Sequence, residues 1–502
     1  MPIPKEILAV ERPVNTVVVA YGKDRSRFAV RQRVGCRYVG GRRLPVNGPT
    51  IGHIVDGRYV PRARPAPEAP APVSQAPVDL RDWAVVELVS RVSGDLLGEL
   101  RSVYAEEDAV RILCIAALRV CYPGVRDSEL RERYEDSVLC DLHPGVALSR
   151  NSVSRFLNGL GRACSRISRF MRARAEAVGA DHHLLVDGTL KTDDSRVNSL
   201  SDFSRKASRK GTRDISILYA YDLERREPVC SKCFPGNMLD LTAYEEFLEE
   251  NGVTRGLVVA DKGFPSGAAA GHLSRHPELH HLNPVRRNSR LIAAHDLRRL
   301  TSILPGFEGV TCRKERCGEE DRWLYAFRDA ARAAEEERSW LDRAGARGSH
   351  SSEEYERRRQ SFGLVVLESD LDMPPETAYR AYACRWEIEI VMRYYKSACE
   401  FDETRVHDDY SVIGSEFCDF LATVLTFRLL RAFDEAGLLE RRGYGRIMSI
   451  LRRAKKVRLD GDEWRLIKIN PSYIELLQAL GLLPKPDTPP KRRRGRPPKS
   501  TV

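Results

Sequence analysis

The sequence lacks an apolar run long enough to cross a membrane. Its longest apolar run, residues 420–427, ends at Arg428, whereas a membrane-spanning helix needs about 20 apolar residues. The first residues, Met-Pro-Ile-Pro-Lys, also lack the charged and then apolar segments of a secretory signal. These absences predict a cytoplasmic protein with no membrane partner.

A disulfide framework is missing as well. The 12 cysteines are spread over 502 residues, and in a reducing cytoplasm they are expected to be free thiols. Cys230-x-x-Cys233 and Cys312-x4-Cys317 together offer four thiolates for zinc, but only the first pair has the tight spacing of a zinc site. We therefore favour ordinary buried thiols over a zinc site.

Acidic residues are outnumbered by basic ones. The chain has 71 Asp and Glu against 82 Lys and Arg, which gives a formal net charge of +11. This excess favours a polyanionic partner, although many soluble proteins share it. The 42% of hydrophobic residues suffice for buried cores, and the length of 502 residues predicts roughly three domains.

Residues 1–60 predict a small β module. Short alternating runs at 16–20 and 50–55 indicate strands, and Asp56-Gly57 is a hairpin-turn pair. The Pro- and Ala-rich stretch at 61–79 predicts an extended linker. A nucleic-acid-facing surface and a plain solvated surface are equally consistent with the arginines of this module, which are Arg31, Arg33, Arg37, Arg42 and Arg43.

Residues 80–180 predict a helical segment, because apolar residues recur at helical spacing. Within it, Leu148 to Leu157 reads as a short polar turn followed by a basic helix. That pattern suits the second helix of a DNA-binding helix-turn-helix, and it also suits a structural helix in a bundle. Both interpretations stay open.

From His182 the pattern changes to buried strands. The run ending at Val186 is followed by Asp187-Gly-Thr, and the run at 256–260 is followed by Asp261-Lys-Gly-Phe. Strands, a helix at 241–250 and a further strand predict an α/β sheet. Two apolar strands that each end in an aspartate are what a two-carboxylate metal site requires.

Other acids and histidines compete for this role. None of the nearby acids combines a preceding apolar run with a following Gly-Thr, which favours Asp187. The histidine pairs His182-His183 and His280-His281 are potential metal ligands, but we favour a position beside strands without chemistry. The competing acids are Asp193, Asp194, Asp202, Asp214 and Asp222.

The remaining segments differ in character. Residues 296–373 are too long for a loop in a compact domain and contain several expected strands, so they predict an inserted subdomain. Residues 436–484 are expected to be a C-terminal helical region. Residues 485–502 form a basic tail that is disordered by composition.

The most informative stretch runs from Tyr382 to Lys396, behind a proline pair that suits a helix start. On one helix, a charged face formed by Arg385, Glu389, Arg393 and Lys396 lies opposite an apolar face. Glu387 points away from the charged face. A solvated stripe of Glu–Arg and Glu–Lys pairs is the plainer interpretation. The apolar face consists of Ile388, Val391, Tyr395 and Ala398.

The spacing Tyr382-x2-Arg385-x3-Glu389-x6-Lys396 resembles the Y-R-E-K signature of IS4-type DDE transposases. The motif Val406-His-Asp-Asp-x-Ser-Val-x-Gly414 is similar to the IS1634-like branch of that group. The resemblance implies a ribonuclease H-like catalytic domain at 181–295 and 374–435, interrupted by the 296–373 insertion.

The resemblance also implies the chemistry. Asp187, Asp261 and Glu389 would be catalytic and would hold two Mg²⁺ (or Mn²⁺) ions for cutting and joining DNA. Tyr382, Arg385 and Lys396 would bind backbone phosphates, and Arg393 on the same face is expected to do the same. No other cofactor is expected.

The partners implied are the terminal inverted repeats of an insertion sequence, the target DNA and a second protomer in a paired-end complex, in association with the bacterial nucleoid. Arg494 and Arg496, in the tail motif Arg-Gly-Arg-Pro, resemble an AT-hook that enters the minor groove. Two other functions stay open: a catalytically silent DNA-binding protein derived from a transposase, and a ribonuclease H-like DNA nuclease.

Overall fold

The chain divides into two compact units, Met1–Pro77 and Val78–Val502. Among the helices that the structure covers, none is long and apolar enough to cross a membrane. The computed structural model describes residues 2–39, 42–62, 78–193, 195, 197–204, 211–238, 240–260, 270–317, 322–347, 351–398, 400–404, 406–459 and 462–485.

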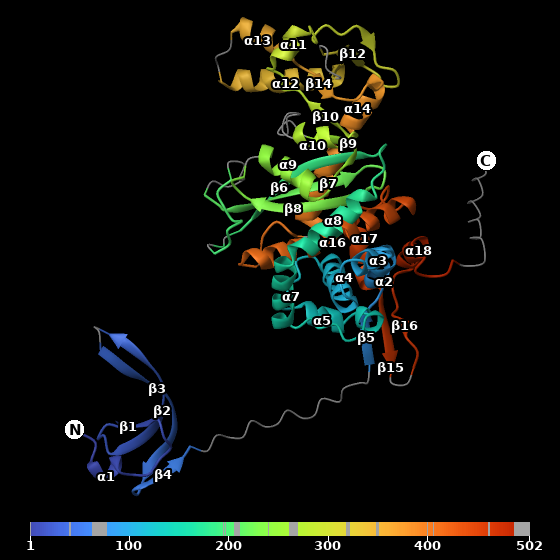
Figure 1. Ribbon diagram of the computed structural model, residues 1–502. Coiled ribbons are helices and arrows are strands. Elements are labelled where there is room, and N and C mark those ends of the chain that lie inside the picture. The colour runs from blue at the N-terminus through green and yellow to red at the C-terminus, as the bar shows by residue number, and fades with distance from the viewer. Residues whose placement is uncertain are drawn as a thin grey trace, which may run out of the picture. The chain divides into compact units, whose positions relative to one another are not determined.

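The first unit is a four-stranded antiparallel sheet in the order β1-β2-β3-β4 (Figure 1). Asp56 and Gly57 both adopt positive φ, 48° and 71°, and they join β3 to β4, which confirms the predicted hairpin turn. Val18, Val30 and Ile54 form its small buried core. The elements are α1 (Lys5–Leu8), β1 (Thr16–Tyr21), β2 (Arg27–Val39), β3 (Arg42–Val55) and β4 (Arg58–Pro61).

The centre of the second unit is a nine-stranded mixed sheet in the order β11-β12-β13-β14-β10-β9-β6-β7-β8. Only β6–β9 and β9–β10 pair in parallel. The apolar runs that predicted strands form the core of this sheet. Helices α9 and α10 lie on one side of β6–β8, and α16 lies on the other side (Figure 1). The elements are β6 (His183–Thr192), β7 (Asp214–Asp222), β8 (Glu227–Pro235), α9 (Asp240–Glu250), β9 (Arg255–Ala260), α10 (Ala270–Arg275) and β10 (Glu278–Pro284).

Residues 296–373, predicted as an inserted subdomain, extend this same sheet. β14 pairs with β10, with Leu282 opposite Ser369, and β13 and β12 follow outward. The segment also contributes to a second core, which contains Ile292, Leu324 and Val366. The elements are α11 (Arg290–Ala294), β11 (Ser302–Ile303), β12 (Val310–Arg316), β13 (Trp323–Asp329), α12 (Ala330–Arg347), α13 (Ser352–Arg359) and β14 (Leu364–Ser369).

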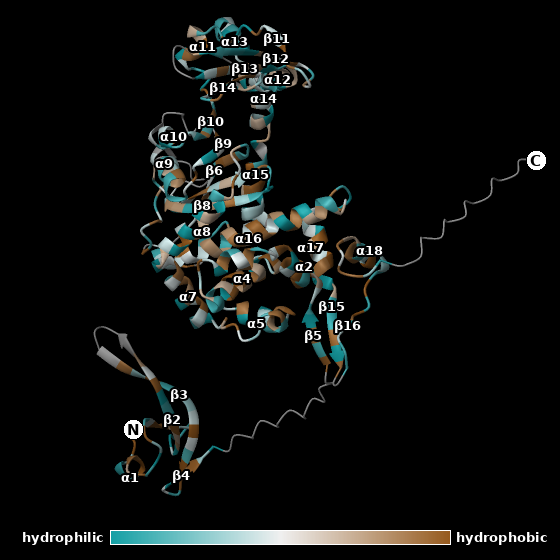
Figure 2. Cartoon of the chain, turned by 45° about the vertical axis from the view of Figure 1, so that its right-hand side comes forward, coloured by the Kyte–Doolittle hydropathy of each residue, from teal (hydrophilic) through white to brown (hydrophobic). Residues whose placement is uncertain are grey.

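The 27-residue helix α16 (Asp409–Glu435) joins the helical segment to the sheet. It contacts α2, α4, α7 and β8, and Figure 2 shows apolar residues along α4 and α16. Gly161 and Gly414 let α7 and α16 approach closely, because a Cβ on Gly161 would lie 1.8 Å from the Tyr410 carbonyl oxygen. The helices before the sheet are α2 (Ala84–Ser93), α3 (Leu96–Arg101), α4 (Glu106–Cys121), α5 (Leu130–Glu135), α6 (Leu139–Leu142), α7 (Arg150–Arg162) and α8 (Cys164–Glu176).

The C-terminal region is not purely helical, which corrects the expectation for 436–484. Between α17 (Tyr444–Arg453) and α18 (Pro471–Ala479) lie two strands, β15 (Lys455–Leu459) and β16 (Arg465–Leu466). They form a small sheet with β5 (Val78–Asp82) in the order β16-β15-β5. Residues that pair in this small sheet are far apart in sequence, since Arg458 of β15 is opposite Asp79 of β5, more than 370 residues earlier.

Candidate active site

Asp187 lies inside β6, not at its end as the sequence predicted, because β7 continues to pair with β6 through Thr192. Asp187 is opposite Tyr219 in this antiparallel register, so their side chains point to the same face of the sheet. The Tyr219 ring packs against the rings of Tyr395 and Phe420. Asp187 is half-buried and therefore faces the helices that carry those two residues.

The second predicted carboxylate, Asp261, lies outside the described residues. Ala260, which precedes it, ends β9 and pairs with Val186 of β6. The described part of β9 therefore reaches the residue next to Asp187. The role of Asp261 stays a prediction.

The segment from Tyr382 to Lys396 is not one continuous helix, which corrects the sequence-based expectation. α14 (Pro375–Ala383) ends in a tight turn at Cys384 and Arg385, α15 spans Trp386–Arg393, and a π-helical turn, η2, spans Tyr394–Ala398. The wide π turn places two adjacent tyrosines in different aromatic clusters. Tyr394 contacts the rings of Phe427 and Tyr444, whereas Tyr395 contacts Tyr219.

The predicted two-faced character of this segment is confirmed by burial. Ile388, Val391 and Tyr395 are fully buried, at 0–1% exposure, whereas the Glu389 side chain is 52% exposed. The Nη2 atom of Arg385 lies 3.0 Å from Glu389 Oε1. The plainer interpretation, an ion pair between residues four apart, therefore describes this contact.

α15 packs against β6, and two charges show how it lies along the strand. Burial raises the pKa of Glu387; the charge of Glu224 adds to this rise and the charge of Arg226 opposes it. Both of these residues come just after β7, next to the residues of β7 that pair with the start of β6. At the other end, burial raises the pKa of Asp214, which is opposite Thr192, and the charge of Lys396 opposes that shift. Glu389 therefore lies between these ends, beside the strand that carries Asp187.

Most of the competing acids are occupied by other contacts. Asp193 accepts hydrogen bonds from Ser195 and Asn198, and Asp222 contacts His182 at 2.7 Å. Asp202 accepts from Asn237, while Asp194 lies outside the described residues.

The histidine and cysteine alternatives also have a definite place. His182, Asp222 and Glu224 offer ligand atoms within 4.8 Å of one another at the start of β6, although the local contacts already pair His182 with Asp222. Within the described part of the chain, no such group includes a cysteine. Burial raises the pKa of the Cys230 thiol to about 12, which fits an ordinary buried thiol.

The predicted DNA-contacting residues of this segment differ in exposure. Tyr382 and Lys396 are half-buried, and Arg393 is exposed. Arg494 and Arg496 lie outside the described residues. In the helical segment, α7 buries one face against α16 and exposes Arg150 and Arg155, so its DNA-reading role stays a prediction.

A buried ionic network beneath the site was not predicted. The ammonium of Lys191 contacts Glu416 and lies 3.0 Å from Asp419 Oδ2, while Arg119 Nη1 lies 2.7 Å from Asp419 Oδ1. The Tyr395 hydroxyl donates to Glu416 Oε2 at 2.6 Å. Lys191 lies four residues after Asp187, hence on the same strand face, and alternation could have predicted that face but not the acids of α16 that Lys191 contacts.

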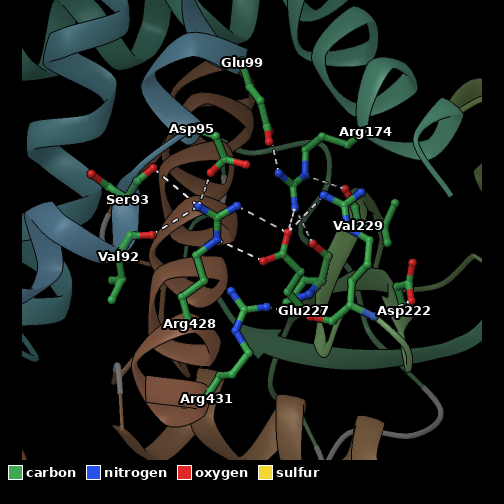
Figure 3. A network of polar contacts seen from close by, with 12 residues as sticks. Val92, Ser93, Asp95, Glu99, Arg174, Asp222, Glu227, Val229, Arg428 and Arg431 are labelled. Atoms are coloured by element: carbon green, nitrogen blue, oxygen red, sulfur yellow. Dashed lines mark hydrogen bonds and ion pairs between the residues drawn. The ribbon is translucent and has the colours of Figure 1, made fainter. Parts of the chain in front are cut away.

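A second buried network fastens the helical segment to the sheet (Figure 3). Glu227 of β8 accepts a hydrogen bond from Arg428 of α16 and one from Arg174 of α8, both at 2.9 Å. Arg428 also donates to Asp95 and Arg174 to Glu99, just before and within α3. The first network links α16 to β6, and the second links it to β8.

A family model matches the part of the chain that carries this candidate site. Residues 179–412 match the family model described as "Transposase DDE domain". A solved structure described as a piggyBac transposase synaptic complex with hairpin DNA shares 12% sequence identity, covers 73% of this chain and 77% of its own, and has a TM-score of 0.38. A search of curated proteins gave no significant match. Residues 179–412, which include Asp187 and Glu389, are therefore similar to a transposase DDE domain, whose fold is ribonuclease H-like.

Proposed function

We propose that this chain is the DNA transposase of an insertion sequence, of the IS1634-like branch of the IS4 type. It would bind the terminal inverted repeats of its element, cut the DNA there and join the ends to target DNA. The observation that carries the proposal is the placement of Asp187 on the helix-facing side of β6, against which the Glu389 helix packs, within a matched transposase DDE domain.

The donor set suits Mg²⁺ or Mn²⁺. Asp187 is half-buried and Glu389 is exposed, so each can reach a hydrated cation. Carboxylate oxygens are the ligands that such ions prefer. Together with Asp261 they would hold two ions, which supply charge neutralisation at the attacking and leaving oxygens of a phosphodiester.

The surrounding cations would bind the substrate. Arg393 is exposed, and Arg385, which contacts Glu389, and Lys396 are partly exposed. Guanidinium groups suit backbone phosphates because two of their N–H groups can bind one phosphate. Release of Arg385 from Glu389 would free both groups, the carboxylate for metal and the guanidinium for DNA. Tyr382 beside them, and Arg494 and Arg496 in the tail, complete the proposed contacts to DNA.

Assembly and location follow from the same proposal. Transposon ends are cut and joined in pairs, so two protomers would bring two ends together in a homodimeric complex on the bacterial nucleoid in the cytoplasm.

One observation favours a second candidate, a DNA-binding protein without catalysis. The Arg385–Glu389 ion pair gives Glu389 a structural partner in the absence of metal, so an inactive binder would also tolerate this carboxylate.

The test uses the purified full-length chain, DNA that carries the element's own ends, and Mg²⁺. We expect cleavage followed by transfer of the ends into a target plasmid. Asp187→Asn, Asp261→Asn and Glu389→Gln should each abolish cleavage and leave DNA binding nearly unchanged, and Glu387→Gln is the matched control that should cut normally. Normal cleavage by all three variants would refute the assignment. Binding without cleavage by the wild type would favour the silent binder, and cleavage without joining a nuclease.

A further inference from the structure

Strands β2 and β3 continue beyond the sheet of the first unit as a two-stranded ribbon. β1 pairs with β2 only from Arg27 to Gln32, and β4 pairs with β3 only from Gly52 to Val55. Residues 33–39 and 42–47, which we call the ribbon, pair with each other, and at its base the Arg33 amide also donates to the Asn15 carbonyl (Figure 1). At about 3.3 Å per residue, the ribbon is roughly 20 Å long.

The ribbon region carries charge of one sign. Between Asp24 and Asp56 the sequence has seven arginines and no acidic residue. Arg31 and Arg33, at the base of the ribbon, are exposed, and within the described residues neither has an acidic partner. The other ribbon arginines lie toward its tip, where the register places Arg37 opposite Leu44, Arg43 opposite Tyr38 and Arg42 opposite Val39. The result is a narrow polycationic projection.

Its edges are poorly suited to another β-strand. Pro45 and Pro49 remove two N–H donors from β3, and the register of β2 against β3 shifts at three places between Val30 and Gly35. A strand added from a protein partner would meet missing donors and a bulged, twisted edge. Two apolar side chains, Val34 at 61% and Leu44 at 41% exposure, are nevertheless left open to solvent on the ribbon. The faces of the ribbon therefore remain available, and its edges do not.

We propose that this ribbon seats in a groove of duplex DNA. A two-stranded ribbon has the width that the major groove admits, and minor-groove binders also combine arginines with apolar side chains that wedge between base steps. The arginines contact the phosphates on both walls of the groove, and Val34 and Leu44 contact the groove floor. The inference rests on the proposed function only in taking DNA as the polyanion.

The test measures binding of the full-length chain to a labelled duplex over a range of salt concentrations, in the Glu389→Gln background so that the DNA stays intact. The ribbon variant combines Arg37→Ala, Arg42→Ala and Arg43→Ala. The matched control combines Lys23→Ala, Arg58→Ala and Arg62→Ala, which removes the same charge from exposed positions of the same unit outside the ribbon. We expect the ribbon variant to bind at least tenfold more weakly near 0.15 M salt. The slope of the logarithm of the binding constant against the logarithm of the salt concentration should become shallower by about 2–3, because each lost phosphate contact lowers it by about one. The control should change affinity less than threefold.

Two further measurements make the outcome decisive. A lysine triple at the same three ribbon positions keeps the charge and should keep the salt slope, which excludes misfolding as the cause of weak binding. Netropsin fills the minor groove and methyl green occupies the major groove. One of these compounds should displace the protein with the unchanged ribbon from DNA more strongly than it displaces the ribbon variant. Equal losses in the ribbon and control variants, or competition by neither compound, would overturn the inference. If the wild type binds and cleaves DNA but the ribbon variant binds equally well, only this inference fails and the proposed function stands.

Discussion

Arg385 and Glu389 form an ion pair across one helical turn, with 3.0 Å between Nη2 and Oε1, at the position where the proposed metal site needs a free carboxylate. The pair is partly exposed, so it contributes little to stability and is readily exchanged for other partners. Under the proposed function, Arg385 would compete with the metal for Glu389 before DNA binds and would bind a backbone phosphate afterwards.

We therefore expect Arg385→Ala to lower the Mg²⁺ concentration needed for half-maximal cleavage while weakening DNA binding several-fold. The melting temperature should stay within about 2 °C of wild type, because an exposed i,i+4 pair contributes less than about 1 kcal/mol. Metal titrations of cleavage and DNA titrations measure the two effects. Arg131→Ala, which breaks an exposed i,i+4 pair with Glu135 remote from the site, is the control and should change neither. Unchanged metal and DNA dependence in Arg385→Ala would leave the ion pair a purely structural feature.

The π turn after α15 is held by the hydrogen bond from the buried Tyr395 hydroxyl to Glu416. Tyr395→Phe should lower the free energy of unfolding by about 2 kcal/mol, since the bond is made to a buried charged group. Lys191→Met should cost more, about 3–5 kcal/mol, because it leaves Glu416 without its cation.

Urea unfolding of both variants measures these losses, and Tyr394→Phe is a control for Tyr395→Phe. Tyr394 also contacts aromatic rings but, unlike Tyr395, is only partly buried. A loss in Tyr394→Phe as large as in Tyr395→Phe would show that the hydrogen bond to Glu416 is not what holds the turn.

The second network predicts that the stability of the fold depends strongly on Glu227. Glu227→Ala would leave Arg174 and Arg428 buried without their shared carboxylate, and we expect a loss of about 3–5 kcal/mol in the free energy of unfolding. Glu106→Ala, which breaks an exposed pair with Arg101, should leave the urea midpoint unchanged. Equal midpoints for Glu227→Ala and wild type would mean that the helical segment is not fastened through this carboxylate.

The sequence predicted those parts of the fold whose signal is local. The Asp56-Gly57 turn, the apolar runs of β6 and β9 and the buried face of Ile388 and Val391 each follow from a few neighbouring residues. Interactions between distant segments had no such signal. The pairing of β15 with β5 and the joining of β14 to β10 depend on which strand edges meet in space, and no short pattern records that.

The candidate site likewise has features that a local sequence pattern predicts and features that depend on distant residues. Asp187 and Glu389 could be singled out from short local patterns, of which Y-R-E-K is the specific one and Asp-Gly-Thr is a common turn, and their catalytic roles stay predictions. The break at Cys384 and the π turn could not, because Tyr395 contacts Tyr219 and Glu416, which are remote in sequence. The Lys191 network was missed for a related reason: a lysine in a strand is expected to be exposed until a buried acid on another element is known.

Close contact between α7 and α16 predicts opposite effects for two glycines of one helix. Gly161→Ala would place a Cβ 1.8 Å from the Tyr410 carbonyl oxygen, so the helices must separate, and we expect a loss of at least about 2 kcal/mol. Gly159→Ala meets no atom within 4 Å and is exposed, so it should stabilise by up to about 1 kcal/mol through helix propensity. Thermal unfolding of both variants checks the signs, and destabilisation by both would contradict the packing argument.

The stability of the protein should depend on pH through the ionisation of Glu336 in α12. Burial alone would raise its pKa, but hydrogen bonds from Arg287, from the Gly363 amide and from Arg332 outweigh burial and lower the pKa from 4.5 to about 2. Because the pKa is lower in the folded protein than in the unfolded chain, the ionised form adds stability above about pH 4.5. That stability is lost as the pH falls from about 5 toward 2.

Glu336→Gln should therefore destabilise the protein at pH 7 by about 2 kcal/mol, a value reduced for the partial exposure of the side chain. The difference from wild type should shrink steadily between pH 5 and pH 3, because the wild-type carboxylate becomes protonated there. Urea unfolding at several pH values measures the difference, and Glu335→Gln, an exposed neighbour on the same helix, is the control that should show no such trend. A difference between Glu336→Gln and wild type that is the same at pH 7 and pH 3 would show that the charge of Glu336 does not hold α12 to the start of β14.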